Sequence, residues 1–305
     1  MPLTPAQIDQ YHEHGYLIAP NVLAAADVQP VIDCIDAIVE QRARELLAQG
    51  KITELCAGQD FTRRFAGIYA QCKAIGENFD IMLLRPRAMF EFLFNDHLLD
   101  AVAQLVGSEL TCNPIQHVRP KLPVTVTGEE HSSFQNVPWH QDAAVTWEEA
   151  DPSDIVTCWI PLVNATAHNG CMQIIPDVHR QGYIEHQSEG GTTVKPHLLP
   201  KTPPVTAECP FGGVIFMNKY TPHLGLTNRS DTIRWTMDLR YQATGQPTGR
   251  PFWPAIVVRS PSQPASVQHS YEEWCRRWEH DLVASKGIAW HRTVPKEKRM
   301  PVKSA

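Results

Sequence analysis

The feature that most constrains the fold is a histidine and an aspartate, His140 and Asp142, separated by one residue in an extended stretch. Side chains two apart on a strand point to the same side, so these two can bind one metal ion together. A second histidine, His223, follows the short apolar run 213–217, which is typical of a buried strand. Arg234 then opens a stretch that alternates like another strand. The fold must therefore bring side chains from separate strands to one cavity.

This set of ligand types narrows the chemistry. Two histidines and one carboxylate on one face of an octahedron leave positions open on the metal, which suits ferrous iron that binds a chelating cosubstrate and dioxygen. A closed structural metal site would not leave such positions. The same residue types also suit zinc, so a Zn(II)-dependent hydrolase or isomerase is an alternative. That alternative gives Arg234 no role.

The ordered set resembles the phytanoyl-CoA dioxygenase family of Fe(II)/2-oxoglutarate-dependent oxygenases. The similarity covers most of the chain and is carried by segments 14–18, 140–142, 153–159, 169–172 and 213–216, together with His223 and Arg234. The resemblance implies that His140, Asp142 and His223 bind Fe(II). It also implies that Arg234, with Thr236 on the same face, binds the distal carboxylate of 2-oxoglutarate through a planar fork that lysine lacks.

The activity implied by the resemblance is oxidation of a small organic metabolite by O2, with release of succinate and CO2. Related halogenating enzymes replace the carboxylate ligand with a small residue. Asp142 is present here, so hydroxylation, or else desaturation or ring formation, is favoured. A barrel that binds 2-oxoglutarate and metal without catalysis is a further alternative. An acyl-CoA, a polar metabolite and a natural product all remain open as the substrate.

Three further positions bear on cosubstrate binding. Trp159, in the apolar strand expected at 155–163, either packs in the core or forms a wall of the cosubstrate pocket. Lys121, near the end of a strand expected at 110–122, is either a cosubstrate ligand, as the resemblance implies, or an exposed strand-end lysine. The family often has serine two residues after the metal histidine, where this chain has Gly225, so that hydrogen bond is absent or supplied elsewhere.

The pattern of short strands predicts the fold class. Asn169-Gly170 between two apolar runs is typical of a hairpin turn, so we expect 155–163 to pair with 171–175. Successive antiparallel pairs favour a jelly-roll-like double sheet. With the resemblance, this gives a mainly β protein with flanking helices around a double-stranded β-helix core, also described as jelly-roll or cupin-like.

We expect residues 1–305 to form one domain, because β-barrels and sandwiches of this size are commonly single units. It would consist of an N-terminal helical and strand decoration at about 1–107, a barrel core at about 108–245 and a C-terminal extension at 246–305. The expected helices are a Thr4-capped helix ending near 14–15, a long helix from residue 24 packed on a sheet, a helix at 90–106, and a C-terminal helix whose aromatic residues pack on the barrel.

Two segments allow a substrate-related interpretation. Residues 181–209 form a long insertion interrupted by glycine and proline, which favours a lid or specificity loop over a simple connection. Arg63 and Arg64 lie in a stretch without clear periodicity. They are either a solvated pair on a partly helical decoration or residues that meet an acidic group of the substrate. His179 is interpreted as structural, since three metal ligands are already supplied.

The composition argues for a small-molecule partner. The formal net charge is -6, with no long run of either sign, which argues against nucleic acid or an anionic membrane as the main partner. The eight cysteines are scattered without a CxxC pair and are expected to be reduced core thiols. No secretory signal and no apolar stretch of roughly 20 residues is visible, so we expect a soluble cytoplasmic protein, with organelle targeting left open. The oligomeric state does not follow from the sequence.

Overall fold

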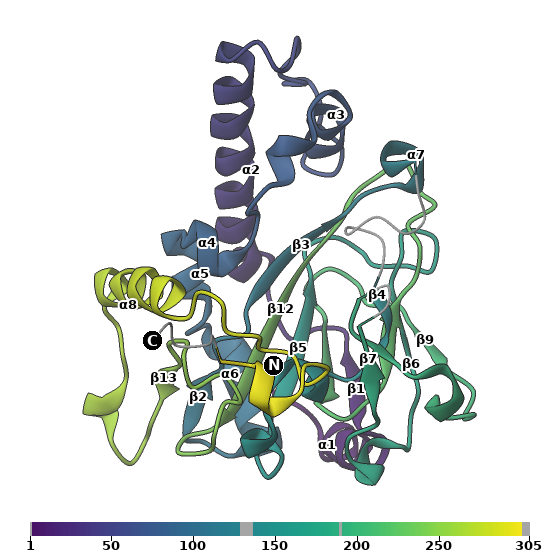
Figure 1. Cartoon of the computed structure of the whole chain (residues 1–305), viewed down its shortest axis with the longest axis vertical. Coiled ribbons are helices and arrows are strands. Elements are labelled where there is room, and N and C mark those ends of the chain that lie inside the picture. The colour runs from purple at the N-terminus through teal and green to yellow at the C-terminus, as the bar shows by residue number, and fades with distance from the viewer. Residues whose placement is uncertain (1, 129–136, 189–190, 301–305) are drawn as a thin grey trace.

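The computed structural model describes residues 2–128, 137–188 and 191–300. Its strands are, in chain order, β1 Tyr16–Ala19, β2 Leu110–Cys112, β3 His117–Lys121, β4 Val137–His140, β5 Val156–Pro161, β6 Met172–Ile174, β7 His186–Gln187, β8 Thr193–Val194, β9 Val205–Ala207, β10 Val214–Asn218, β11 His223–Gly225, β12 Arg234–Ala243 and β13 Ile256–Arg259. The major sheet has the order β1-β10-β5-β12-β2-β13, with β3 also paired to β12. The minor sheet has the order β4-β11-β6-β9, and β7 pairs with β8. The expected mainly β jelly-roll with flanking helices is confirmed (Figure 1).

The helices lie mostly outside the major sheet. They are α1 Pro5–His14, α2 Ala25–Ala48, α3 Arg64–Gln71, α4 Ile81–Leu84, α5 Arg87–Phe92, α6 Asp96–Val106, α7 Val124–Thr127 and α8 Tyr271–Ala284. The Thr4 capping box is confirmed, since the Thr4 hydroxyl accepts from the Gln7 N–H and the Gln7 side chain accepts from the Thr4 N–H. The aromatic residues of α8 are core residues as expected, with Trp274 and Trp278 buried.

Two helix predictions need correction. The helix expected at 90–106 is broken, because the Asn95 side chain accepts a hydrogen bond from the Leu98 N–H at 3.0 Å and caps a new helix, α6. The long helix α2 exists, but its main neighbours are α5 and the 3-10 turn η1 (Lys73–Gly76) rather than a sheet. Figure 1 shows α2 and α3 standing out from the sheets as a helical protrusion.

The strands of the major sheet carry different residues on their two faces. On β10, Val214 and Phe216 belong to the large core beneath the helices, whereas Ile215 and Met217 pack in a smaller core with residues of the minor sheet. This is the two-residue period of a strand whose faces are both covered. The inner face, which looks toward the minor sheet, is where the chemistry-bearing residues gather.

The prediction that the strands on either side of Asn169-Gly170 pair with each other is wrong. The turn forms, with Gly170 at φ 88° and the Asn169 side chain accepting from the Thr166 N–H at 2.8 Å. However, β5 pairs with β10 and β12 in the major sheet, whereas β6 pairs with β11 and β9 in the minor sheet. The turn therefore carries the chain from one sheet to the other.

The strand expected at 110–122 is also interrupted. Its two parts, β2 and β3, both pair with β12, but residues 114–116 leave the ladder between them. Asn113 makes the last backbone bond before the break, from its N–H to the Arg240 carbonyl at 2.8 Å. Its side-chain amide donates to the Gln242 side chain at 2.9 Å and to the Thr248 carbonyl at 3.0 Å, which holds the chain where the pairing ends.

Candidate active site

The three residues that the sequence predicts as metal ligands lie close together. His140 ends β4 and lies directly opposite His223 on β11, with their ring centroids 4.2 Å apart. Asp142 begins the short 3-10 turn η2 (Asp142–Val145) just beyond β4. One ligand atom from each residue lies within 4.8 Å of the others, the only such group found among the described residues. Antiparallel pairing of β4 and β11 thus joins ligands that are far apart in sequence.

Backbone carbonyls fix the orientation of both imidazoles. His140 Nδ1 lies 2.8 Å from the Pro138 carbonyl, and His223 Nδ1 lies 3.0 Å from the Thr221 carbonyl. A carbonyl can only accept, so each Nδ1 carries the proton and each Nε2 keeps its lone pair for a metal. Burial, and then the neighbouring His223, lower the pKa of His140 to about 4, and burial also lowers the pKa of His223. Both rings are therefore neutral near pH 7, as metal ligands must be.

Asp142 is buried and held by two side chains. An Arg240 Nη2 donates to Asp142 Oδ1 at 2.5 Å, and the Thr157 hydroxyl donates to Oδ2. Burial is the largest single influence and would raise the pKa of Asp142, but the surrounding groups, with Arg240 foremost, together outweigh burial and hold this pKa well below its usual range. The carboxylate is thus charged and fixed in orientation. The two imidazoles and this carboxylate fit the donor set of a two-histidine, one-carboxylate iron site.

Arg234 lies on the same inner face of the major sheet and is 4% exposed. Its Nε donates to the Gly170 carbonyl at 3.1 Å and its Nη1 donates to the Thr236 hydroxyl at 2.9 Å. Its guanidinium carbon lies 5.1 Å from the ring centroid of Trp159. Burial lowers the pKa of Arg234 to about 10, and no described carboxylate lies within ion-pairing distance. Within the described part of the chain, the guanidinium is thus a buried cation without a carboxylate partner.

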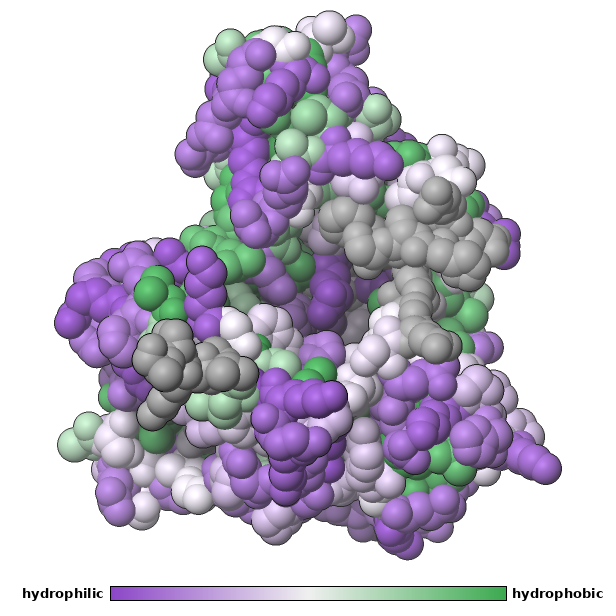
Figure 2. Space-filling model, viewed as in Figure 1, coloured by the Kyte–Doolittle hydropathy of each residue, from purple (hydrophilic) through white to green (hydrophobic). Residues whose placement is uncertain are grey.

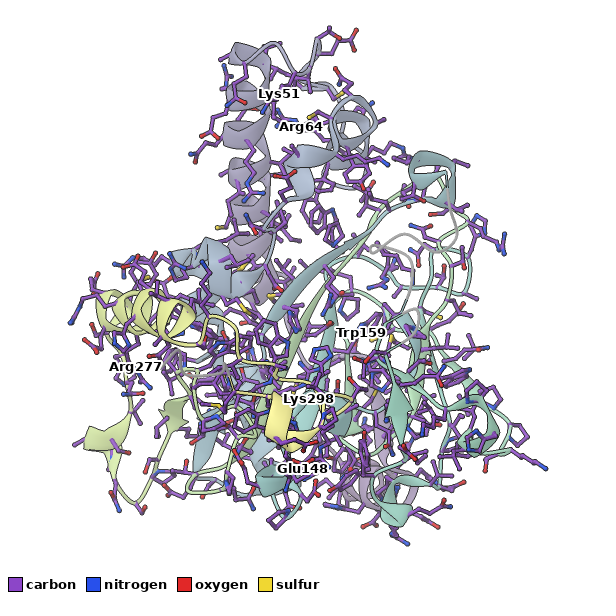
Figure 3. All side chains as sticks on the ribbon, in the orientation of Figure 1. Lys51, Arg64, Glu148, Trp159, Arg277 and Lys298 are labelled. Atoms are coloured by element: carbon purple, nitrogen blue, oxygen red, sulfur yellow. The ribbon has the colours of Figure 1, made fainter. Side chains whose placement is uncertain are left out.

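Trp159 is a core residue as one alternative predicted, and its role in the cosubstrate pocket stays a prediction. It packs in the smaller core with Met172 and Met217, and it also lines the cavity that contains the metal-ligand residues. Figure 3 places it at the centre of the molecule, between the two sheets.

Lys121 is not an exposed strand-end residue, because it is 2% exposed and lies opposite Arg234 in the β3–β12 ladder. Burial, and then the charge of Arg234, lower the pKa of Lys121 to about 6. A Cβ placed on Gly225 would lie 2.9 Å from the Lys121 Nζ. The lysine thus occupies the space beside Gly225, where the family often has a serine.

The cavity at this site has two adjoining compartments. The first, of about 220 Å³, is lined by Arg234, Trp159 and the metal-ligand residues. The second, of about 270 Å³, shares His140, Asp142 and Arg240 with the first and extends to Trp253, Trp290 and Arg250. Figure 2 shows this face of the molecule hollowed below the helical protrusion, with hydrophilic residues in the recess.

The insertion 181–209 borders this cavity within its described part. Gly191 and Thr192 line the first compartment, and the Thr192 hydroxyl is 2.6 Å from Nδ1 of His291 in the C-terminal extension. Its proposed role as a lid stays a prediction.

Arg63 and Arg64 lie elsewhere. Arg63 pairs with Asp231 at 2.7 Å, and Arg64, whose side chain is only 12% exposed, pairs with Glu40 of α2. Figure 3 places Arg64 in the helical protrusion, away from Trp159. The substrate-binding alternative for this pair is not supported, and the description of Arg64 as solvated is wrong.

The comparison with known families decides the classification. The sequence model of the phytanoyl-CoA dioxygenase (PhyH) family matches residues 11–236. The chain belongs to the phytanoyl-CoA dioxygenase family. As a member of this family it is an oxidoreductase that uses non-haem iron, 2-oxoglutarate and O2, which favours the oxygenase over both the zinc enzyme and the non-catalytic barrel.

Relatives with curated names are distant. A methylphosphonate hydroxylase of Gimesia maris is 20% identical over 250 residues, which cover 80% of this chain and 82% of that protein. A probable phytanoyl-CoA dioxygenase of Caenorhabditis elegans is 22% identical over 161 residues, about half of each chain.

Solved structures share the fold. The non-haem monooxygenase ThoJ, in its apo form, has a TM-score of 0.62 at 16% identity and covers 91% of this chain and 98% of its own. The 2-oxoglutarate-dependent epimerase SnoN from nogalamycin biosynthesis has a TM-score of 0.51 at 21% identity, over 81% of this chain and 87% of its own. In this chain, no helix within 2–128, 137–188 and 191–300 has the length and apolar character needed to cross a bilayer.

Proposed function

We propose that this oxygenase hydroxylates a small organic metabolite at an iron ion held by His140, Asp142 and His223. The observation that carries the proposal is that three ligand side chains, the buried Asp142 and His223 and the half-buried His140, converge beside Arg234, a buried cation with no described carboxylate partner. Arg234 supplies the charge and the planar fork that the distal carboxylate of 2-oxoglutarate requires. A zinc hydrolase would leave this arginine without a function.

The surrounding residues have defined tasks in this proposal. When bound, iron and 2-oxoglutarate would activate O2, and 2-oxoglutarate would be converted to succinate and CO2. Thr236 accepts a hydrogen bond from Arg234 and so orients the fork toward the cavity. Lys121, next to Arg234 and Gly225, adds a second polar contact to the cosubstrate, and Trp159 forms the wall on which it rests. The buried setting excludes water from the cavity.

The carboxylate ligand separates oxygenation from halogenation. Asp142 occupies the position where a halogenating relative would have a small residue, and two hydrogen bonds, from Arg240 and Thr157, hold it in place. Loss of either imidazole or of this carboxylate would remove one of three protein ligands. The ligand set therefore supports hydroxylation, or else desaturation or ring formation, over halogenation.

The test is anaerobic spectroscopy of the full chain. Fe(II) plus 2-oxoglutarate should give a weak visible charge-transfer band, because the cosubstrate chelates the metal at its open positions. His140→Ala, Asp142→Ala and His223→Ala should each abolish the band. His12→Ala, at an exposed histidine, is the matched control and should keep it. If all three site variants bind iron and give the parent band, the ligand assignment is wrong.

A further inference from the structure

The arginines of the second compartment are ion-paired with one exception. Arg119 pairs with Asp238 at 3.0 Å and Arg240 pairs with Asp142 at 2.5 Å, whereas the Asp80 carboxylate is 2.6 Å from Nδ1 of His117, whose pKa burial lowers. Arg250, which also lines the compartment, has no carboxylate within ion-pairing distance among the described residues. Arg250 is therefore the one arginine of this compartment without an ion-pair partner among the described residues.

Arg250 is also short of hydrogen bonds. It is 3% exposed, its Nε donates to the Val145 carbonyl at 2.7 Å, and its buried Nη1 has no hydrogen-bond partner in the described structure. Its guanidinium carbon lies 4.6 Å from the Trp253 ring centroid and 5.5 Å from that of Trp290. The two aromatic faces attract the cation, but as π acceptors they satisfy an N–H donor only weakly. Leaving such a donor buried and unpaired is costly, so its presence in a cavity wall points to a ligand.

The position of Arg250 separates it from cosubstrate binding. Arg234 and Trp159 line the first compartment, and Arg250 lines only the second. Both compartments reach His140 and Asp142, so groups bound in either one lie beside the metal site. Arg234 is assigned to 2-oxoglutarate. Arg250 is therefore available to bind an anionic group of the molecule that is oxidised.

We propose that Arg250 binds the anionic group, a carboxylate or a phosphonate, of a small acid that is the primary substrate. This rests on the proposed function, because it takes the neighbouring arginine as the cosubstrate anchor. The fork of Arg250 matches two oxygens of such a group. Val145, Ile115 and Met82 add an apolar wall for a short carbon skeleton.

The size of the compartment agrees with a small acid. At about 270 Å³ it is below the roughly 300–1,000 Å³ of pockets that enclose drug-sized ligands. A CoA thioester would leave most of its bulk outside. The opposing explanation is that Arg250 is a structural clamp, which ties the turn after Asp142 to the tryptophans of the C-terminal extension.

The experiment uses the full chain, anaerobically loaded with Fe(II) and 2-oxoglutarate, and a panel of small acids with matched neutral analogues. The panel contains methylphosphonate, 2-aminoethylphosphonate and three- to six-carbon carboxylic acids, paired with phosphonate diesters and carboxamides. Binding is read from the change in the visible band and, separately, from calorimetry with apoprotein and 2-oxoglutarate. We expect at least one acid to bind and its neutral analogue to bind far more weakly.

Variants then assign the effect to Arg250. Arg250→Gln should weaken binding of that acid by about 30-fold or more, since it removes one partner of a buried charged pair. Arg250→Lys should restore part of the affinity, because it keeps the charge and loses the fork. Iron content and 2-oxoglutarate half-saturation should stay at the parent values in both. Arg276→Gln, at an exposed arginine, is the matched control and should bind like the parent.

Three outcomes overturn the proposal: no acid binds the parent, acids and neutral analogues bind alike, or Arg250→Gln binds the acid as well as the parent does. If both Arg250 variants lose iron and 2-oxoglutarate binding together with acid binding, the residue is a structural clamp and the proposal also fails. The parent band with Fe(II) and 2-oxoglutarate is measured before any acid is added. Its absence would count against the proposed function and not against the acid site alone.

Discussion

The cosubstrate contact proposed for Arg234 can be tested apart from metal binding, because Arg234 hydrogen-bonds to Gly170 and Thr236 and to none of the three metal-ligand residues. A buried charge-assisted pair that loses one partner costs roughly 2–5 kcal/mol, so Arg234→Ala should raise the 2-oxoglutarate requirement by about 30-fold or more. Arg234→Lys should recover only part of this loss. The measurement is succinate formation titrated against 2-oxoglutarate, with iron content determined alongside and the exposed Arg44→Ala as control. An unchanged 2-oxoglutarate dependence in Arg234→Ala would remove the cosubstrate assignment.

Residues of the site differ in how far the sequence could predict them. His140 and Asp142 were readable because a single extended residue, Gln141, separates them, although Asp142 lies beyond β4 in η2 and not on the strand as expected. Arg240 was missed, although the two-residue period that relates Arg234 to Thr236 extends to it on β12. Arg250 carries no such signal. It lies in a segment rich in glycine and proline, and what marks it is a missing partner, which only the packed structure reveals.

Turns were easier to predict from the sequence than their strand partners. Asn169-Gly170 specifies a tight reversal through the backbone freedom of Gly170, and the structure confirms that reversal. Which strands then pair is decided by contacts with distant strands, β10 and β12 on one side and β11 and β9 on the other. For the same reason the capping box at Thr4 was predictable, whereas the packing partners of α2 were not.

Arg299, just after the last described element, the 3-10 turn η7 (Lys296–Lys298), forms an ion pair with Glu148. The stability that this pair contributes should depend on pH. Arg299 donates to Glu148 at 2.6 and 2.8 Å, and these bonds lower the pKa of Glu148 from its ordinary 4.5 to about 2. Because the folded pKa is the lower one, the contribution is fully present above about pH 4.5 and is lost as the pH falls toward 2. Arg299→Gln should therefore be less stable than the parent near neutral pH, and this difference should shrink near pH 3.

Urea unfolding at both pH values measures the difference in the free energy of unfolding. Lys298→Gln, at an exposed neighbour without an ion-pair partner among the described residues, is the matched control and should unfold like the parent. Arg299 also lies 5.9 Å from the Trp147 ring centroid. A stability loss that stays constant with pH would assign the role of Arg299 to this aromatic contact and not to the charge of Glu148.

At the scale of the whole molecule, an aromatic cluster joins the helical protrusion to the major sheet. Trp235 points to the outer face of β12, and Phe61, Phe65 and Phe79 surround it with ring centroids 5.3–5.6 Å away. Trp235 Nε1 also donates to the Phe61 carbonyl at 3.1 Å. Arg234 directly precedes Trp235 in β12, and its side chain lines the cavity. One segment of β12 therefore contributes one side chain to the aromatic cluster and the adjacent side chain to the cavity.

A mutation in this aromatic cluster can test whether residues 1–305 unfold as the single domain expected from the sequence. Phe65 is fully buried, and Phe65→Ala should lower the free energy of unfolding by roughly 3–5 kcal/mol through lost burial and the cavity left behind. If the protrusion and the sheets form one cooperative unit, hydrogen exchange should accelerate by the same factor for the core amides of α2 and of β5. Leu47→Ala, at a side chain 38% exposed, should have little effect and serves as the control. Acceleration confined to α2 and α3, with β5 protected as in the parent, would show that the protrusion unfolds separately and that the barrel core does not depend on it.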